Sequence, residues 1–308
     1  MPSILWHIEP TSKCMLECPL CDRTKFHNDF NKRLLHEINI EHLINFLKNT
    51  IIQRVCMCGN NGDPIYHSKF YDLCFELKKI GCKLEITTNG SGRKKEWWVD
   101  ICKVLDKDDR IIFSIDGLAD TNHLYRKNSD WLSLMSAIDV ATKSSVHTVW
   151  KFIVFKHNQH QIDEAKKLSL SLGINEFRLE KSDRWWVKDL MPDEEFVNAD
   201  YKRMKLALKG ETNGKHIMSP KCMDKILKIP NQSLYIDAEG NFYPCCWLGT
   251  YSFRYKTLFN PMKKKYNIKD NTLEQILGNT EIQNFFESTK SYETADKYCK
   301  IYCGVKNG

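Results

Sequence analysis

Residues 11–23 read TSKCMLECPLCDR and place three cysteines within eight positions, as Cys14-x3-Cys18-x2-Cys21. The chain has 13 cysteines among its 308 residues. Its N-terminus, MPSILWHIEP, lacks the basic and apolar regions of a secretory signal, and no apolar run reaches the roughly 20 residues of a membrane helix. We therefore expect a cytoplasmic protein. Disulfides are rare in that compartment, so grouped cysteines predict a metal site or catalysis.

The cysteines fall into three groups along the chain. The first is the C-x3-C-x2-C arrangement, which we call the cluster motif. A second group lies near the other end and comprises Cys222, Cys245, Cys246, Cys299 and Cys303. The five between them are Cys56, Cys58, Cys74, Cys82 and Cys102. Most of these five lie in apolar patterns that are typical of small buried side chains, although Cys56 and Cys58 adjoin a glycine-rich segment.

Short apolar runs alternate with helical periods from residue 4 to about residue 182. The expected strands are residues 4–10, 54–60, 83–89, 111–116, 149–155 and 176–182. Six strand–helix units in succession predict an α/β fold, with a parallel sheet and helices outside it. Six units fall short of the eight of a closed barrel, so a partial barrel and a doubly wound sheet both fit. In either fold, ligands gather at the carboxyl ends of the strands.

The alternation stops after about residue 190. Residues 233–247, SLYIDAEGNFYPCCW, predict a β-hairpin with its turn at 238–241, and residues 273–289 predict one helix. We therefore expect two domains, residues 1–190 and residues 191–308.

Three thiolates at the end of the first strand indicate a particular kind of metal centre. Thiolates select zinc or iron–sulfur clusters, and structural zinc is closed by four ligands. Three thiolates on a four-iron cluster leave one iron open for a substrate or cofactor. The alternative is a zinc knuckle with a fourth ligand from elsewhere. The motif, placed after the first of six strand–helix units, resembles that of the radical S-adenosylmethionine (SAM) superfamily.

The resemblance implies a fold and an activity. The fold would be a partial (β/α)6 TIM-like barrel with a small C-terminal auxiliary-cluster domain, built from a β-hairpin and a helix. In this family the open iron of a [4Fe-4S] cluster chelates the amino and carboxylate groups of SAM. One electron then cleaves SAM to a 5′-deoxyadenosyl radical, which abstracts a hydrogen atom from the substrate. The protein would thus be an oxidoreductase or maturase that needs an electron donor of the flavodoxin or ferredoxin type.

The resemblance also assigns SAM contacts to the strand ends. The segment CGNNGDP at 58–64 resembles the family's GGE-type segment, without matching it strictly. Glycines let backbone approach a ligand, and a carboxylate or exposed carbonyl accepts hydrogen bonds from an ammonium. Arg126 matches an arginine that pairs with the SAM carboxylate, which suits a guanidinium. The expected SAM contacts are Leu20, Gly59, Asn60, Asn61, Gly62, Asp63, Thr88, Asn89, Ser114, Asp116, Arg126, His157 and Asn158.

The C-terminal cysteines resemble the auxiliary-cluster extensions called SPASM or twitch domains. The pattern is Cys222, then Gly240-x4-Cys245, then Cys299-x3-Cys303. These four thiolates would close one auxiliary [4Fe-4S] cluster. Cys246 is then spare or replaces Cys245 or Cys222. The alternative is structural zinc on the same four cysteines, which would hold the tail but carry no electrons.

The substrate stays open at this level. Relatives with such extensions modify peptides or proteins, and some dehydrogenate small molecules. The chain begins at its first strand, which disfavours a fused peptide-recognition domain, although a separate protein could serve in its place. The single auxiliary cluster tilts the expectation toward a small molecule or a free-standing enzyme. The formal charge of +7 leaves a nucleotide or nucleic-acid substrate open without indicating one. Three hypotheses remain: a radical SAM enzyme whose auxiliary cluster assists net oxidation, a zinc- or iron–sulfur-stabilised binding module for nucleic acid or protein, and a degenerate homologue that binds partners.

Overall fold

The computed structural model describes residues 4–26, 35–48, 50, 52–182, 185, 187–198, 216–219, 233–251 and 265–306. Contacts divide the chain into two compact units, which we treat separately. The barrel unit comprises Glu9–Glu37 and Cys56–Asn198. The tail unit comprises Met1–Ile8, Ile38–Val55 and Ala199–Gly308. The contacts group the first strand with the C-terminal residues, so these units differ from the two domains expected from the sequence. The domain boundary near residue 190 stays a prediction.

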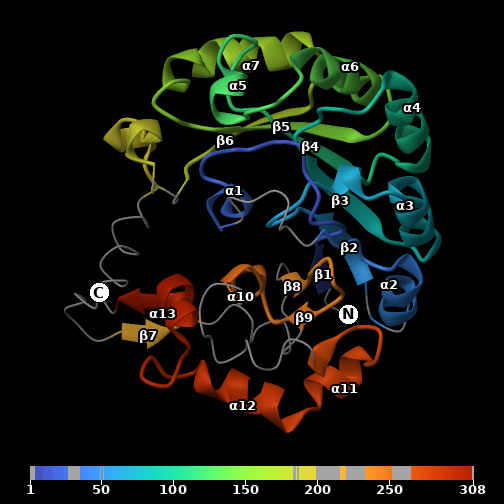
Figure 1. The fold of residues 1–308 in the computed structure, drawn as a ribbon, viewed down its shortest axis with the longest axis vertical. Coiled ribbons are helices and arrows are strands. Elements are labelled where there is room, and N and C mark those ends of the chain that lie inside the picture. Colours follow the sequence, from blue (N-terminus) through green and yellow to red (C-terminus); the bar gives the residue numbers. More distant parts are fainter. Residues whose placement is uncertain are drawn as a thin grey trace. The chain divides into compact units, whose positions relative to one another are not determined.

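All six predicted strands are present. They are β1 (Ile4–Ile8), β2 (Ile52–Met57), β3 (Lys83–Thr88), β4 (Arg110–Ser114), β5 (His147–Ile153) and β6 (Glu176–Glu180). The hydrogen-bonded order is β6-β5-β4-β3-β2-β1-β8-β9, and β3 to β6 pair in parallel (Figure 1). The order of β1 to β6 follows the chain, without the reversal of a doubly wound sheet. The α/β partial barrel is therefore confirmed.

Helices cover the outer side of the strands in the barrel unit (Figure 1). The principal ones are α3 (Phe70–Lys79), α4 (Lys95–Val104), α6 (Trp131–Thr142) and α7 (Ile162–Ser171), with the shorter α1 (Asp22–Phe26) and α5 (Asn122–Tyr125). Apolar residues at helical spacing make the contact, and Trp98 of α4 lies 5.8 Å from Phe113 of β4 between ring centroids. Asp130 begins α6 as its N-cap, since its side chain accepts a hydrogen bond from Ser133 N at 3.1 Å.

The opposite, inner side of these strands is more polar. On β3 the buried residues are Leu84, Ile86 and Thr88, whereas Glu85 and Thr87 between them are only half-buried. Because successive side chains of a strand point to opposite faces, this alternation separates a helix-covered face, apolar up to Thr88 at the strand end, from a polar inner face. Ligand-binding groups are thus available inside the partial barrel without any cost to its core.

The tail unit contains the predicted hairpin, formed by β8 (Ser233–Ile236) and β9 (Phe242–Tyr243). Strand β8 also pairs in parallel with β1, which explains why β1 belongs to this unit. Helix α2 (Ile40–Leu47) packs there through Phe46, whose ring lies 5.6 Å from that of Trp6. Further elements are β7 (His216–Met218), α10 (Cys246–Tyr251), α13 (Lys297–Cys303) and β10 (Gly304–Lys306).

The single helix expected at 273–289 is wrong in one respect. The structure has two helices there, α11 (Leu273–Leu277) and α12 (Thr280–Ser288). Asn279 has an extended backbone, and its side chain accepts a hydrogen bond from Glu281 N at 2.9 Å. Asparagine is among the preferred N-cap residues, so it begins a new helix rather than continuing the first.

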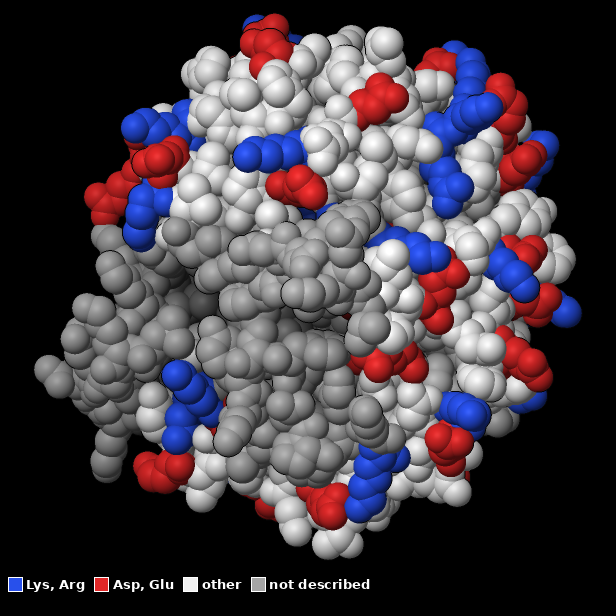
Figure 2. Space-filling model, viewed as in Figure 1, with Lys and Arg blue, Asp and Glu red and all other residues white. Residues whose placement is uncertain are grey.

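The surface charges agree with the small formal charge. Figure 2 shows basic and acidic side chains interleaved over the described part of one face. Within the described ranges, no helix combines the length and the apolar character that a bilayer crossing requires.

Candidate functional site

A cavity of about 390 Å³ opens in the barrel unit, within the usual size range of ligand sites. Its wall includes all three cysteines of the cluster motif, from the loop that precedes α1. Most of the rest of the wall comes from the carboxyl ends of strands and the segments that follow them, as expected for a parallel sheet, and the loop, α1 and α5 add further residues. Other lining residues are Leu16, Leu20, Arg23, Cys58, Gly59, Asn60, Asn61, Gly62, Asp63, Thr87, Thr88, Asn89, Ser114, Tyr125, Arg126, Lys151, Ile153, Glu180, Lys181 and Ser182.

Buried apolar residues hold the loop of the cluster motif in place. Leu16 and Leu20 are both buried and alternate with the cysteines. The loop is turned by hydrogen bonds from Leu16 N to Cys14 Sγ at 3.4 Å and from Cys21 N to Cys18 O at 2.9 Å. One short loop therefore presents three thiols to a single cavity.

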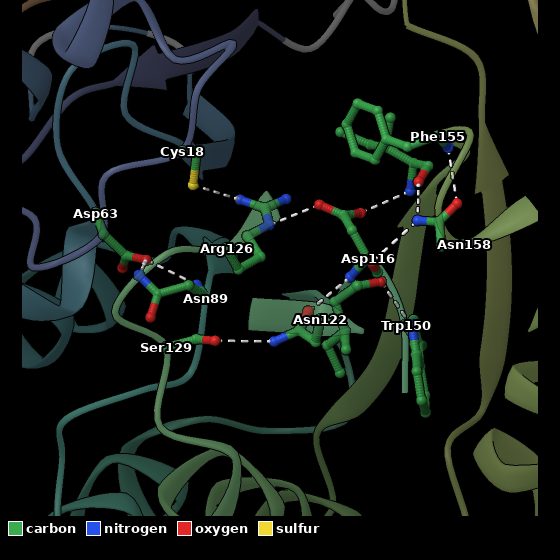
Figure 3. A network of polar contacts seen from close by, with 12 residues as sticks. Cys18, Asp63, Asn89, Asp116, Asn122, Arg126, Ser129, Trp150, Phe155 and Asn158 are labelled. Atoms are coloured by element: carbon green, nitrogen blue, oxygen red, sulfur yellow. Dashed lines mark hydrogen bonds and ion pairs between the residues drawn. The ribbon is translucent and has the colours of Figure 1, made fainter. Parts of the chain in front are cut away.

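The surroundings of the thiols suit metal-bound thiolates. Burial raises the pKa of Cys14 to about 12 and that of Cys18 to about 11, so a metal that binds them as thiolates would displace a proton from each. Two N–H donors face the sulfurs. Asn89 Nδ2 lies 3.8 Å from Cys14 Sγ. Arg126 Nη1 lies 4.0 Å from Cys18 Sγ, as Figure 3 shows. Such donors stabilise thiolate charge on a cluster. The residues present thus fit an iron–sulfur cluster bound by three thiolates.

One further observation concerns single metal ions. Within the described part of the chain, no three His, Cys, Asp or Glu side chains are grouped closely enough to hold one ion.

The glycine-rich segment after β2 lines the cavity as predicted, but its glycines have a different physical reason. A Cβ on Gly59 would lie 1.9 Å from Gly62 O, and a Cβ on Gly62 would lie 1.8 Å from Thr11 O. Both glycines are therefore required because the backbone packs against itself. Asp63 N also donates to Lys13 O at 2.8 Å, which ties the segment to the loop of the cluster motif.

Glu9 anchors the same segment and was not identified from the sequence. Its side chain is 2% exposed, and its Oε1 accepts hydrogen bonds from Asn61 N at 2.6 Å and Gly62 N at 2.9 Å. An acidic residue directly after an apolar strand was the only signal in the sequence. Glu9 thus holds the backbone of the segment at Asn61 and Gly62.

The carboxylate of Asp63 organises the end of β3. Its Oδ2 accepts from Asn89 N at 2.7 Å, from Asn89 Nδ2 at 2.5 Å and from Thr88 Oγ1 at 3.1 Å, and its Oδ1 accepts from Ile65 N at 3.3 Å. Burial raises the pKa of this carboxyl to about 6. Because four donors of the protein already point at it, Asp63 primarily positions Thr88 and Asn89, and through Asn89 the sulfur of Cys14.

Arg126 occupies the wall of the cavity and is held there by Asp116 (Figure 3). Its Nε donates to Asp116 Oδ2 at 2.6 Å. The other oxygen, Oδ1, accepts from Ile153 N at 2.7 Å, and Asp116 itself is fully buried. One carboxylate thereby links the arginine to the end of β5.

Three of the predicted SAM contacts do not line the cavity: Asp116, His157 and Asn158. The Asn158 side chain is fully buried and donates to Asp116 O at 2.9 Å and to Ile153 O at 3.0 Å, while accepting from Phe155 N at 2.7 Å. The ring of His157 stacks on Phe155 at 5.5 Å. Asp116 and Asn158 thus hold the ends of β4 and β5 together through hydrogen bonds, outside the cavity wall. The other ten predicted contacts all lie on the cavity wall.

In the tail unit, four of the five C-terminal cysteines fall within described residues, while Cys222 lies outside them. Cys245 follows β9 and Cys246 begins α10. Cys299 and Cys303 are both on α13, four positions apart, which puts them on one face of that helix. The Cys299-x3-Cys303 spacing therefore lets one helix present two thiols on the same side. That these cysteines hold one cluster remains a prediction.

Comparison with known families gives the identity of the fold. The family model for the radical SAM superfamily matches residues 8–168, which is more than half of the 308 residues. The chain belongs to the radical SAM superfamily. A second model, for an iron–sulfur cluster-binding domain (SPASM), matches residues 222–304. The cofactors of this radical SAM protein are therefore a [4Fe-4S] cluster and SAM, with auxiliary iron–sulfur binding in its C-terminal domain.

Solved structures show the same fold. SuiB of Streptococcus suis aligns with a TM-score of 0.64 at 14% identity, over 97% of this chain and 72% of that one. Its complex with the precursor peptide SuiA gives 0.61 at 13% identity, over 97% and 70%.

A curated relative covers less of the chain. The tungsten-containing aldehyde ferredoxin oxidoreductase cofactor-modifying protein of Pyrococcus furiosus is 22% identical over 184 residues. The match covers 55% of this chain and 49% of that protein, so the chain spans about half the length of this relative.

Proposed function

We propose that this radical SAM protein cleaves SAM reductively and removes a hydrogen atom from a substrate, with the auxiliary cluster assisting net oxidation. The observation that supports this most is the shared cavity: the three thiols of the cluster motif and ten residues expected to contact SAM line the same wall. When bound, the cluster supplies one electron and SAM supplies the adenosyl group that becomes the hydrogen acceptor.

The residues on the cavity wall would bind the cluster and SAM in distinct ways. Cys14, Cys18 and Cys21 hold the cluster as thiolates. The guanidinium of Arg126 adds positive charge next to Cys18 and suits a carboxylate ligand, while Asp116 keeps its orientation fixed. Leu20 contributes an apolar surface that excludes water and suits an adenine ring.

The auxiliary site and the partners complete the proposal. Cys222, Cys245, Cys299 and Cys303 would hold the second cluster, which takes up the electron of the substrate radical. An electron donor of the flavodoxin or ferredoxin type reduces the protein. The precursor peptide bound to SuiB supports a peptide or protein substrate, and small molecules and nucleotides remain in the same proposal.

The test is SAM cleavage by the protein after anaerobic iron–sulfur reconstitution and reduction with dithionite. We expect 5′-deoxyadenosine from the wild type and from Cys102→Ala, a matched variant at a buried helical cysteine away from the cavity wall. The Cys14→Ala variant should produce none. A wild type that carries iron but makes no 5′-deoxyadenosine would contradict the proposed enzyme, and zinc without iron would select the binding module.

A further inference from the structure

The inner face of the partial barrel carries several charges, and most of them are paired. On this face, toward the amino end of β4, Arg110 Nη1 lies 3.9 Å from Glu85 Oε2. Glu176 lies 2.9 Å from Arg178 Nε and 3.7 Å from His147 Nε2. These charges therefore have partners within the protein.

Two charges on the cavity wall differ from them. Lys151 of β5 and Glu180 of β6 both line the cavity and are half-buried. Among the described residues, neither side chain makes an ion pair within 4.0 Å, although the charge of Glu180 acts on Arg178 two residues earlier. The neighbouring Lys181 contrasts with them, because its Nζ donates to Glu195 O at 2.6 Å. Both side chains are therefore available for direct ion pairs with a ligand that carries complementary charges.

Strand register fixes the spacing of the two charges. Strands β5 and β6 pair with Ile153 opposite Glu180 and with Lys151 opposite Arg178. Glu180 is thus one strand across and two residues further along than Lys151, so their Cα atoms are about 8 Å apart. Their alternation places both side chains on the inner face, with Ile153 opposite Glu180 and Arg178 opposite Lys151.

We propose that Lys151 and Glu180 form a substrate subsite for a zwitterionic group, a carboxylate and an ammonium a few bonds apart. Lys151 binds the carboxylate, Glu180 binds the ammonium, and Ile153 contacts the hydrocarbon between them. An amino acid, or the charged groups of a peptide, has this chemistry. The inference deepens the proposed function by naming a substrate class for the same cavity, and it rests on that function.

The first test is direct binding to the reconstituted, unreduced protein saturated with SAM. The probes are γ-aminobutyrate, butyrate and butylamine, measured by calorimetry. We expect γ-aminobutyrate to bind at least about tenfold more tightly than either singly charged analogue, a difference of about 1.4 kcal/mol. If the wild type does not prefer the zwitterion, the proposal is overturned.

Variants then assign the two charges. Lys151→Met should remove the preference over butylamine, and Glu180→Gln the preference over butyrate. The matched controls are Lys156→Met and Glu164→Gln, two exposed residues that do not line the cavity, and they should leave both preferences intact. The exchange K151E/E180K should regain a preference for the zwitterion, because it retains both charges.

SAM also carries an ammonium and a carboxylate, so its own binding is the deciding comparison. We expect Lys151→Met and Glu180→Gln to bind SAM as the wild type does. A loss of SAM affinity in both variants, with γ-aminobutyrate binding unchanged, would place the two charges in the SAM site and overturn the proposal. Because these measurements need no turnover, a failure to form 5′-deoxyadenosine would count against the proposed function alone.

Discussion

Replacement of Asp116 by asparagine should destabilise the barrel unit through one buried contact. Asp116 is fully buried and uses one oxygen for Arg126 Nε at 2.6 Å and the other for Ile153 N at 2.7 Å. Asparagine keeps the size of the side chain and one oxygen. If that oxygen still accepts from Ile153, the new amide N–H points at the guanidinium, so that a donor faces a donor.

The expected magnitude follows from what remains buried. The side chain of Arg126 is 15% exposed and would lose its counter-ion. Removal of one partner of a buried ion pair costs about 3–5 kcal/mol, and the opening of Arg126 toward the cavity places this case at the lower end, at about 3 kcal/mol. With an m-value of about 3 kcal/mol per M, the urea midpoint should fall by about 1 M.

A double-mutant cycle, measured by urea unfolding, isolates the interaction energy between Asp116 and Arg126 from their other contacts. The variants are D116N, R126M and D116N/R126M, and we expect a coupling of about 2 kcal/mol because the double variant leaves no unpaired charge. The matched control is Asp139→Asn, which removes an exposed pair with Lys143 at 2.5 Å and should leave the midpoint unchanged. Additive single effects, or a D116N cost below about 1 kcal/mol, would refute the reasoning.

Three further changes test the site around this pair. Gly62→Ala should abolish SAM binding, measured by equilibrium dialysis, because its Cβ would meet Thr11 O at 1.8 Å; unchanged affinity would mean that the segment can move. Glu9→Ala should weaken SAM binding by at least about tenfold, since two backbone N–H groups lose their acceptor, whereas the exposed Glu164→Ala should have no effect. Replacement of all three cysteines of the cluster motif by alanine should leave about four irons per reconstituted chain, bound by the auxiliary cluster. An iron content near zero would contradict the presence of that second cluster.

Much of the fold and of the site could be predicted from local patterns. The cluster motif, the six strands and their carboxyl-terminal polar residues depend on spacing within one segment. The resemblance to the radical SAM family, together with the common edge at which parallel strands end, assigned residues as distant as Leu20, Asn61, Asn89 and Ser114 to one site, and all four line the cavity. The alternation of strand and helix left a barrel and a doubly wound sheet open, and only the strand order distinguished them.

The partners of the polar groups could not be predicted in the same way. Asp116 and Asn158 occupy strand ends just as the true wall residues do, but their hydrogen bonds go to neighbouring strands. The same limit hid Glu9, whose partners lie more than fifty residues away.

The sequence alone therefore determined the superfamily, the order of the strands along the chain and the thiols that would hold the first cluster. Only the tertiary structure decided which polar side chains face the cavity and which support it from behind. It also decided that Lys151 and Glu180 line the same cavity wall without forming an ion pair with each other. The reason is that the sequence gives the chemistry of each side chain, whereas the register between strands that are distant in the chain decides which side chains become neighbours.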